Sequence, residues 1–265
     1  MTTPAVPAAA GPAAAGPHAD RVYVVTGGTR GIGAAITRGL LEAGARVCVV
    51  ARDPDGVARF NDGTGRTMGV AIDLADPAAV PDAFAAVLDR WGRFDGVVNN
   101  AGITKVGDSL EFPLDDFARI LDVNVTGVFA CAQAAARIMA ERGGGSIVSI
   151  ASMTSFTGQP QRAAYIAAKS AVLGLTRALA TEWGPLGIRV NAIAPGYIRT
   201  DLTEDLIERG VLRLDVIEGR TPLRRFGSTA DVVGAALFLL GGQSSFTTGQ
   251  ALVVDGGWTV NGYWR

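Results

Sequence analysis

Short, continuously apolar runs alternate along the chain with longer stretches in which apolar residues recur at helical spacing. Continuous rather than alternating apolar character is typical of strands that are covered on both faces. Seven such runs are predicted as strands: residues 22–26, 46–50, 68–72, 94–98, 146–150, 188–193 and 251–254. Helices are predicted over residues 33–43, 78–91, 114–141, 165–183 and 229–240.

This alternation predicts an α/β fold with a doubly wound parallel sheet and helices on both faces. The 265 residues, 48% of them hydrophobic, are enough for one large core. We predict one domain over residues 21–265, preceded by a flexible extension over residues 1–20 that is rich in Ala, Pro and Gly. An amphipathic, mixed-charge stretch at about 197–226 predicts a helical substrate lid; a helix pair merely packed on the surface is the alternative.

Composition excludes several classes of function. The formal net charge of −1 offers no basic footprint for nucleic acid or an anionic membrane. The only histidine, His18, falls in the predicted extension, which argues against Ser-His-Asp hydrolases and histidine-based zinc sites. Cys48 and Cys131 lack metal-ligand spacing and are expected to be buried free thiols, so no metal site is predicted. Without a signal-peptide pattern or an uncharged apolar run of membrane-spanning length, we expect a cytoplasmic protein.

The first predicted strand leads into a glycine-rich turn and then into a helix. Glycines allow the backbone to turn sharply and approach a pyrophosphate, and the helix N-terminus offers free N–H groups to that charge. The spacing is TGxxxGxG, and a helix-entry turn without a ligand is the alternative. The residues expected to line this nucleotide site are Gly27, Thr29, Arg30, Gly31, Ile32 and Gly33.

The choice of dinucleotide follows from charge at the end of the second predicted strand. An NAD site commonly carries an acidic residue there, whereas the 2′-phosphate of NADP requires cations. Arg52 follows that strand and Arg30 lies in the glycine turn, which favours NADP(H), although Asp53 opposes it and leaves NAD(H) open. Asp73, directly after the third predicted strand, is expected to contact the adenine edge or else to cap a turn.

A tyrosine and a lysine stand one helical turn apart in a chain that has only four tyrosines and two lysines. At four-residue spacing, Tyr165 and Lys169 share one helix face. A phenol with a pKa of about 10 is a poor acid or base at neutral pH, and a nearby ammonium lowers that pKa. The pair is therefore a candidate acid/base unit, with an ordinary surface helix as the alternative.

Two further candidate site segments follow other predicted strands. Ser152 comes just after residues 146–150, and Asn100, Ala101 and Gly102 come just after residues 94–98. Ligands of open α/β sheets bind outside the carboxyl ends of the strands. A hydroxyl donor, a phenol and a nucleotide loop at one sheet edge indicate hydride transfer coupled to proton transfer.

The motifs together resemble the complete motif set of the short-chain dehydrogenase/reductase family, from Arg21 to the C-terminus. They are TGGTRGIG (26–33), NNAG (99–102), Asn124 in LDVNVTG, Ser152, Tyr165 with Lys169, and PGYIRT (195–200). The resemblance implies a seven-stranded Rossmann-type sheet and a four-residue catalytic group.

The resemblance also implies a role for each residue of that group. Tyr165 would exchange a proton with the substrate oxygen and Ser152 would hold that oxygen. Lys169 would bond the nicotinamide ribose and lower the pKa of Tyr165, and Asn124 would position the backbone and a water in a proton relay. Further cofactor contacts are implied for Asn100, Ala101, Gly102, Pro195, Gly196, Ile198 and Thr200.

The sequence specifies the substrate less closely than it specifies the fold or the dinucleotide. The branch that contains gluconate 5-dehydrogenases and deoxygluconate 3-dehydrogenases is resembled most in residues 150–158, 190–200 and 254–258. The 3-oxoacyl carrier-protein reductases share much of the same sequence in these segments. We expect a small carbonyl or alcohol substrate, first a sugar acid or polyol, with Arg162 as a candidate partner for a carboxylate. The alternatives are a ketoreductase acting on a cyclic or acyl ketone, a cofactor-binding regulator without catalysis, and an epimerase.

The resemblance further implies a homotetramer or homodimer. The C-terminal residues 258–264 are apolar and aromatic, which predicts their burial against a neighbouring subunit.

Overall fold

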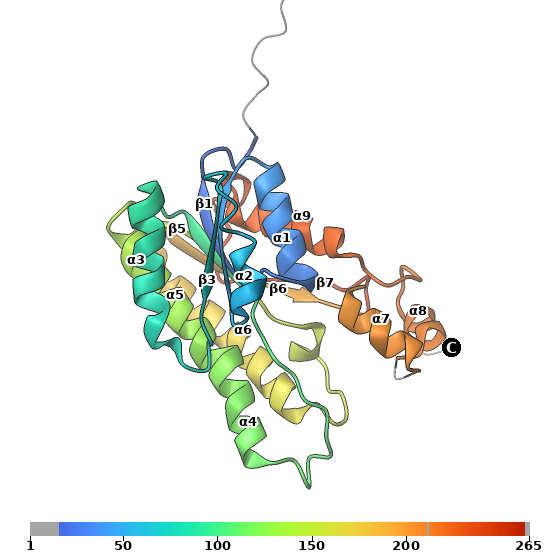
Figure 1. Ribbon diagram of the computed structural model, residues 1–265. Coiled ribbons are helices and arrows are strands. Elements are labelled where there is room, and N and C mark those ends of the chain that lie inside the picture. The colour runs from blue at the N-terminus through green and yellow to red at the C-terminus, as the bar shows by residue number, and fades with distance from the viewer. Residues whose placement is uncertain (1–15, 211, 263–265) are drawn as a thin grey trace, which may run out of the picture.

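The computed structural model describes residues 16–210 and 212–262, in which one parallel sheet lies between two layers of helices (Figure 1). Within these residues the sheet has seven strands in the order β3-β2-β1-β4-β5-β6-β7. The strands are β1 (Val22–Thr26), β2 (Arg46–Ala51), β3 (Thr67–Ala71), β4 (Gly96–Asn99), β5 (Gly145–Ile150), β6 (Ile188–Pro195) and β7 (Ala251–Val254).

The described helices follow the same alternation. They are α1 (Gly31–Glu42), α2 (Pro54–Ala58), α3 (Val80–Trp91), α4 (Leu114–Leu121), α5 (Gly127–Ala140), α6 (Ala163–Trp183), α7 (Asp201–Glu208), α8 (Leu214–Arg220) and α9 (Thr229–Leu240). The π-helical segment Asp122–Thr126 joins α4 to α5.

Each face of the sheet has its own apolar layer. Helices α3, α5 and α6 cover one face, with Phe84, Cys131 and Leu179 in that layer. Helices α1 and α9 cover the other face, with Ile36 and Val232 in theirs (Figure 1). Strands β1 and β4 are buried along their full length. Burial on both faces explains why their sequences are continuously apolar.

The strand order reverses at β1, and this reversal positions the candidate site. β1 pairs in parallel with β2 on one side and with β4 on the other. Such a reversal opens a crevice outside the carboxyl ends of the two strands where the connections part. The register pairs Thr26 with Asn99 and Asn99 with Ser149. The segments that follow β1, β4 and β5 therefore leave the sheet at one edge.

The predicted fold class and all seven predicted strands are confirmed, with strand ends that differ by no more than two residues. The predicted helix over residues 114–141 is present as α4, the π-helical segment and α5 in one continuous run. Helix α2 was not predicted because five residues are too few to show helical periodicity. Cys48 and Cys131 are buried free thiols, as predicted.

The continuous run Leu114–Ala140 is long and apolar enough to cross a membrane, and it is the one such helix among the described residues. In the structure 56% of its most apolar window is buried inside the domain. Cys131, Ala135 and Met139 on this run pack against the sheet. We therefore interpret it as a core helix.

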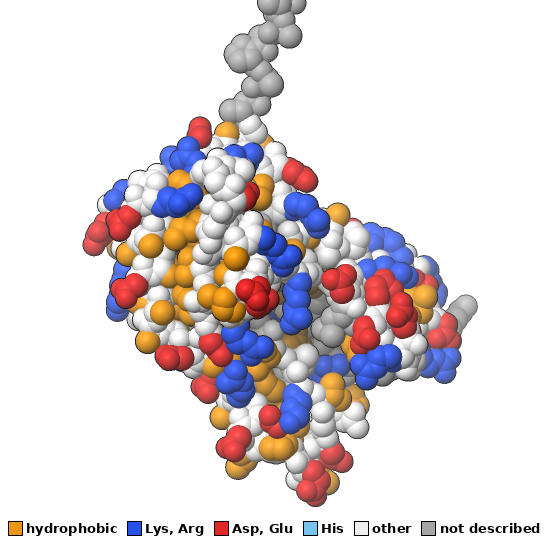
Figure 2. All heavy atoms as spheres, viewed as in Figure 1, with side chains coloured by type: hydrophobic (Ala, Val, Ile, Leu, Met, Phe, Trp, Pro, Cys, Tyr) orange, Lys and Arg blue, Asp and Glu red, His pale blue; other side chains and the backbone are white. Residues whose placement is uncertain are grey.

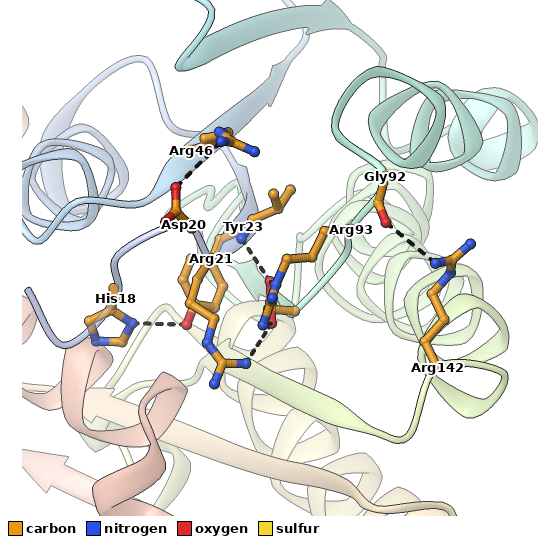
Figure 3. Close-up of polar contacts among 10 residues, drawn as sticks. His18, Asp20, Arg21, Tyr23, Arg46, Gly92, Arg93 and Arg142 are labelled. Carbon is orange, nitrogen blue, oxygen red and sulfur yellow. Dashed lines mark hydrogen bonds and ion pairs between the residues drawn. The ribbon is translucent and has the colours of Figure 1, made fainter. Parts of the chain in front are cut away.

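The first described residues pack against the domain, whereas the sequence predicted a flexible extension over residues 1–20. His18 is 2% exposed, and its Nδ1 lies 2.8 Å from the hydroxyl of Tyr23 in β1 (Figure 3). The two rings also meet edge to face, with centroids 5.5 Å apart. An apolar ring body and one hydrogen-bond partner allow a histidine to be buried, so residues near His18 belong to the folded domain. Residues 1–15, the remainder of the predicted extension, lie outside the described residues.

Helices α7 and α8 occupy the predicted lid and project to one side of the sheet (Figure 1). An apolar cluster of Met153, Ile217, Phe226 and Trp258 holds them to the rest of the domain. Trp258 is therefore buried within its own chain, whereas its burial against a neighbouring subunit was predicted. Trp264 lies outside the described residues, and the homotetramer or homodimer stays a prediction.

Burial lowers the pKa of His18 from its ordinary value of 6.5. Below that value the unfolded chain binds the proton more readily than the folded chain, so stability decreases as pH falls. We expect the thermal midpoint to fall between about pH 7.5 and about pH 5, and to fall less in His18→Gln, which lacks the titrating group. Differential scanning calorimetry at several pH values measures both. Carboxylates titrate mainly below about pH 4, outside this window. Identical pH profiles for the two proteins would contradict the assignment.

Candidate active site

The turn after β1 is packed so closely that two of its glycines have no substitute. Gly27 has a φ of +65°, a conformation that favours glycine. A Cβ added to Gly33 would lie 2.3 Å from the carbonyl oxygen of Gly27 and 2.4 Å from Nδ2 of Asn100. The turn therefore folds back onto the first turn of α1, whose N–H groups lack helical partners and can receive an anion.

Asn100 fixes this turn to the end of β4. Its Nδ2 donates to the carbonyl oxygens of Thr26 and Gly27 at 3.0 and 3.1 Å. In return, the hydroxyl of Thr26 accepts the backbone N–H groups of Asn100 and Ala101, both at 3.1 Å. The structure thus brings together the glycine turn and the NNAG segment, two motifs about 70 residues apart in sequence.

Two exposed arginines lie near the glycine turn. Arg30 and Arg52 are exposed, and neither has a hydrogen bond or ion pair within the residues that the structure describes. Asp53 instead caps α2, where its side chain accepts the backbone N–H of Asp55 at 3.2 Å. The carboxylate that opposed an NADP site in the sequence is thus engaged by its own helix. Figure 2 shows basic side chains gathered beside the hollow between the sheet domain and the lobe that carries α7 and α8.

Asp73 caps a turn, which is one of the two roles that the sequence left open. Its carboxylate accepts the backbone N–H of Ala75 at 3.0 Å and lies 3.3 Å from Nη2 of Arg119. The bond from Ala75 is the main reason that the pKa of Asp73 is lowered, with Arg119 adding to it. A contact between Asp73 and an adenine stays a prediction.

Ser152 and Tyr165 are neighbouring polar groups after β5 and are joined by a hydrogen bond. Ser152 Oγ accepts the backbone N–H of Thr154 at 3.1 Å and its hydroxyl at 2.9 Å. These two bonds use both lone pairs of the serine oxygen, so its own proton remains to be donated. Burial raises the pKa of Tyr165, opposed by a hydrogen bond with Ser152 and by the charge of Arg162. The net upward direction differs from the lowering expected beside Lys169, because burial of the phenol outweighs the opposing effects.

Lys169 lies one helical turn after Tyr165 on α6 and is buried. Its Nζ donates to the carbonyl oxygen of Ile150 at 2.6 Å and lies 5.8 Å from the centre of the Tyr165 ring. Burial lowers the pKa of Lys169 to about 8. Lys169 forms no ion pair among the residues that the structure describes, and a buried ammonium of this kind is a strong donor for a polar ligand group or a phenolate.

Asn124 sits in the π-helical segment, a distortion that frequently marks functional sites. Its amide donates to the carbonyl oxygen of Ile103 and accepts the N–H of Ile103, both at 2.8 Å. A Cβ added to Gly102 would lie 3.1 Å from Oδ1 of Asn124 and 3.5 Å from Nζ of Lys169. The structure therefore brings Gly102, Asn124 and Lys169 together.

The segment after β6 closes the site from the other side. A Cβ added to Gly31 would lie 3.6 Å from Cγ2 of Thr200, so Thr200 faces the glycine turn. Thr200 also caps α7, in a capping box with Thr203. Pro195 ends β6, Gly196 packs against Asp255 and Ile198 is buried. Contacts of these three residues with a cofactor stay a prediction.

The assembled site can bind an anionic group at the glycine turn and exchange a proton at Tyr165. A family model described as enoyl-(acyl carrier protein) reductase matches residues 27–259. A gluconate 5-dehydrogenase of Gluconobacter oxydans (strain 621H) is 40% identical over 242 residues, which cover 90% of this chain and 94% of the relative. The chain belongs to the short-chain dehydrogenase/reductase family.

Other members of the short-chain dehydrogenase/reductase family are equally similar. A 3α-hydroxysteroid dehydrogenase of Mediterraneibacter gnavus is 40% identical over 89% of this chain and 96% of the relative. The crystal structure of a gluconate 5-dehydrogenase from Burkholderia cenocepacia J2315, in complex with NADP and tartrate, has a TM-score of 0.85 and 38% identity. It covers 91% of this chain and 96% of that chain.

Two residues at this family site were missed in the sequence. Arg59, just after α2, donates to the carbonyl oxygen of Thr29 at 3.1 Å and thus joins the basic side chains at the glycine turn. Thr154 orients Ser152 through the bonds described above. Arg59 follows an unpredicted five-residue helix, and a threonine two residues after a serine carries no recognisable signal.

Gly33→Ala is expected to abolish dinucleotide binding, because its Cβ would meet the Gly27 carbonyl and the Asn100 amide. Overpacking of this kind also costs about 1–3 kcal/mol of stability. The matched control is Gly174→Ala on α6, where an added Cβ would meet nothing within 4 Å. Quenching of tryptophan fluorescence by the dinucleotide and thermal unfolding measure the two effects. Normal dinucleotide affinity in Gly33→Ala would rule out the close approach described here.

Proposed function

We propose that this protein is an NADP(H)-dependent oxidoreductase that interconverts a ketone and a secondary alcohol. The observation that carries the proposal is the convergence of Tyr165, Ser152 and Lys169 at the same sheet edge as the glycine turn. A phenol and a serine hydroxyl that acts as a donor provide two donors for one carbonyl oxygen. A pure binding module has no need of the phenol.

The residues at the crevice fit a dinucleotide. Gly27 and Gly33 leave open a cradle that a Cβ would close, and Asn100 fixes its shape. When bound there, the dinucleotide supplies or accepts the hydride. Lys169 is placed to donate to a ribose hydroxyl, because its ammonium lies beside Gly102 at the end of the NNAG segment.

The protein's own part in reduction is to hold the carbonyl oxygen and protonate it. Ser152 donates a hydrogen bond to that oxygen, because Thr154 occupies both of its lone pairs. Tyr165 transfers its proton to the same oxygen as the alcohol forms, and takes it back in oxidation. The ammonium of Lys169 stabilises the phenolate that results. Asn124 positions the backbone at Ile103, which keeps the wall of the site in place.

The preference for NADP(H) rests on charge near the glycine turn. Arg30 and Arg52 have no hydrogen bond or ion pair within the described residues, Arg59 is anchored at Thr29, and Asp53 is engaged as a helix cap. Guanidinium groups suit a phosphate monoester, which they can bind through two parallel hydrogen bonds. A related gluconate 5-dehydrogenase was crystallised with NADP.

A sugar acid or polyol is the substrate class that we favour. Arg162 stands one turn before Tyr165, donates to Thr104 Oγ1 at 3.1 Å, and its charge opposes the raised pKa of both Tyr165 and Tyr197. A guanidinium in this position can bind a substrate carboxylate. The second candidate is reduction of a cyclic ketone, which the similarity to a 3α-hydroxysteroid dehydrogenase favours.

Replacing Tyr165 by Phe is expected to lower kcat by about 10²- to 10⁴-fold, because it removes the proton donor while keeping the ring. NADPH absorbance would be followed with 5-ketogluconate, neutral ketoses, a cyclic ketosteroid and an acyl thioester. Dinucleotide affinity of the variant should be unchanged.

Turnover of the sugar acid that falls selectively in Arg162→Gln would support the carboxylate contact. Turnover of the steroid alone would instead favour the second candidate. A Tyr165→Phe protein as active as the wild type would refute the mechanism. Substrate conversion without a net change in NADPH would identify an epimerase.

Arg52→Gln is expected to raise KM for NADPH about tenfold or more and to leave KM for NADH nearly unchanged. The reason is that a charge-assisted bond contributes about 1.5–3 kcal/mol and only NADPH carries the 2′-phosphate. Initial rates at varied dinucleotide concentration measure both constants, with exposed Arg38→Gln on α1 as the control. Equal effects on the two dinucleotides would exclude Arg52 as the source of selectivity.

A further inference from the structure

A cavity of about 440 Å³ lies at the amino ends of the central strands. Its lining includes Arg21, Asp95, Gly145 and Arg189, which lie immediately before or at the start of β1, β4, β5 and β6. The candidate active site lies at the carboxyl ends of the same strands. Strands of four to eight residues separate the two edges by roughly 13–26 Å. The cavity is therefore distinct from the site that would hold the dinucleotide and substrate.

The charged side chains around this cavity are strongly unbalanced. They are Arg21, Arg93, Arg142, Arg189 and Asp95. Four guanidinium groups and one carboxylate give a formal charge of +3. For a chain whose overall net charge is −1, this is a marked local concentration of positive charge.

Both oxygens of the one carboxylate at this cavity, Asp95, already accept hydrogen bonds. Asp95 accepts Nη1 of Arg21 at 2.6 Å, Nε and Nη2 of Arg93 at 2.5 and 2.7 Å, and the backbone N–H of Val22 at 2.9 Å (Figure 3). Burial alone would raise the pKa of Asp95, but the bonds from Arg93, Val22 and Arg21 outweigh it and lower the pKa. Asp95 therefore has no capacity left to neutralise the other two arginines.

Arg142 and Arg189 form no ion pair within the described part of the chain. Arg142 has one hydrogen bond there, to the carbonyl oxygen of Gly92 at 3.4 Å, and Figure 3 shows it apart from Arg21 and Arg93. Arg189 is half-buried and is held by the hydroxyl of Ser244 at 2.8 Å and the carbonyl oxygen of Gly241 at 3.1 Å. Arg142 is exposed, whereas Arg189 is partly buried, and a partly buried cation without a counterion is unfavourable. The arrangement around Arg189 therefore favours an anion from solution.

The wall between the arginines is built of backbone. Gly143, Gly144 and Gly145 run along it, and Gly187 packs against Gly144. A Cβ on Gly144 would lie 2.2 Å from the carbonyl oxygen of Gly187. These glycines keep side chains out of the space that the guanidinium groups face.

We propose that this cavity binds a small metabolite that carries two oxyanion groups, either phosphoryl groups or carboxylates. Guanidinium groups bind both chemistries through paired hydrogen bonds. The volume is in the range of small-molecule sites and exceeds what one inorganic phosphate fills. Two groups match Arg142 and Arg189, which form no ion pair among the described residues. The site goes beyond the proposed oxidoreductase function and does not depend on it.

The test is isothermal titration calorimetry on the full chain saturated with NADP⁺, which occupies the glycine turn. Inorganic pyrophosphate and citrate are titrated separately, with inorganic phosphate as the single-group comparison. We expect at least one of the two larger anions to bind more tightly than phosphate, and its binding to weaken with added NaCl. Arg142→Gln should weaken it about tenfold, the loss of one charge-assisted hydrogen bond.

The matched control is Arg137→Gln, an exposed arginine on α5 outside the cavity lining, which should bind like the wild type. Tighter binding of pyrophosphate or of citrate identifies the phosphoryl or the carboxylate class. Equal affinity of Arg142→Gln and wild type, or weakening in Arg30→Gln instead, would overturn the proposal. Failure of the oxidoreductase function would appear separately, as lost turnover or NADP⁺ binding with the Arg142-dependent binding intact.

Discussion

The contact between the glycine turn and the end of β4 is the constraint on which the rest of the site depends. Asn100 donates to two carbonyl oxygens of the turn, and Thr26 accepts two backbone N–H groups in return. Gly33 permits this contact because any side chain there would displace the Asn100 amide. The same segment continues to Gly102, beside Asn124 and Lys169. One set of hydrogen bonds at the switch point of the sheet thus fixes both the nucleotide turn and the wall of the reactive site.

Sequence patterns were sufficient wherever the constraint was local or repeated. Strands buried on both faces must be apolar throughout, so all seven were visible, and the motif residues lie at the edge where parallel strands end. What the sequence could not reveal depends on contacts between distant segments. The burial of His18 requires a phenol on β1, and the role of Arg59 requires a five-residue helix that returns it to Thr29. The direction of the Tyr165 pKa depends on burial, which outweighs the neighbouring charges that the spacing suggested.

Arginine is used in two different ways at the two edges of the sheet. At the carboxyl edge, Arg30 and Arg52 are exposed beside a backbone cradle, and we propose that they select among ligands that the glycine turn holds. At the amino edge, the guanidinium groups themselves form the cavity, and the backbone around Gly144 only leaves room for them. Asp95 illustrates the difference, because it holds Arg21 and Arg93 in place while the charge of Arg142 and Arg189 stays uncompensated.

The opposite pKa shifts of Tyr165 and Lys169 have a single cause. Burial disfavours the charged form of each group, so it raises the pKa of the phenol and lowers that of the ammonium to about 8. A phenolate and an ammonium formed together would each relieve the penalty on the other, because opposite charges attract strongly where water is scarce. In the mechanism that we propose, transfer of the phenol proton to a substrate oxygen would therefore cost less with Lys169 charged than with Lys169 neutral. In the proposed mechanism, the apolar surroundings that raise the resting pKa of Tyr165 would also strengthen the charge pair that forms during proton transfer.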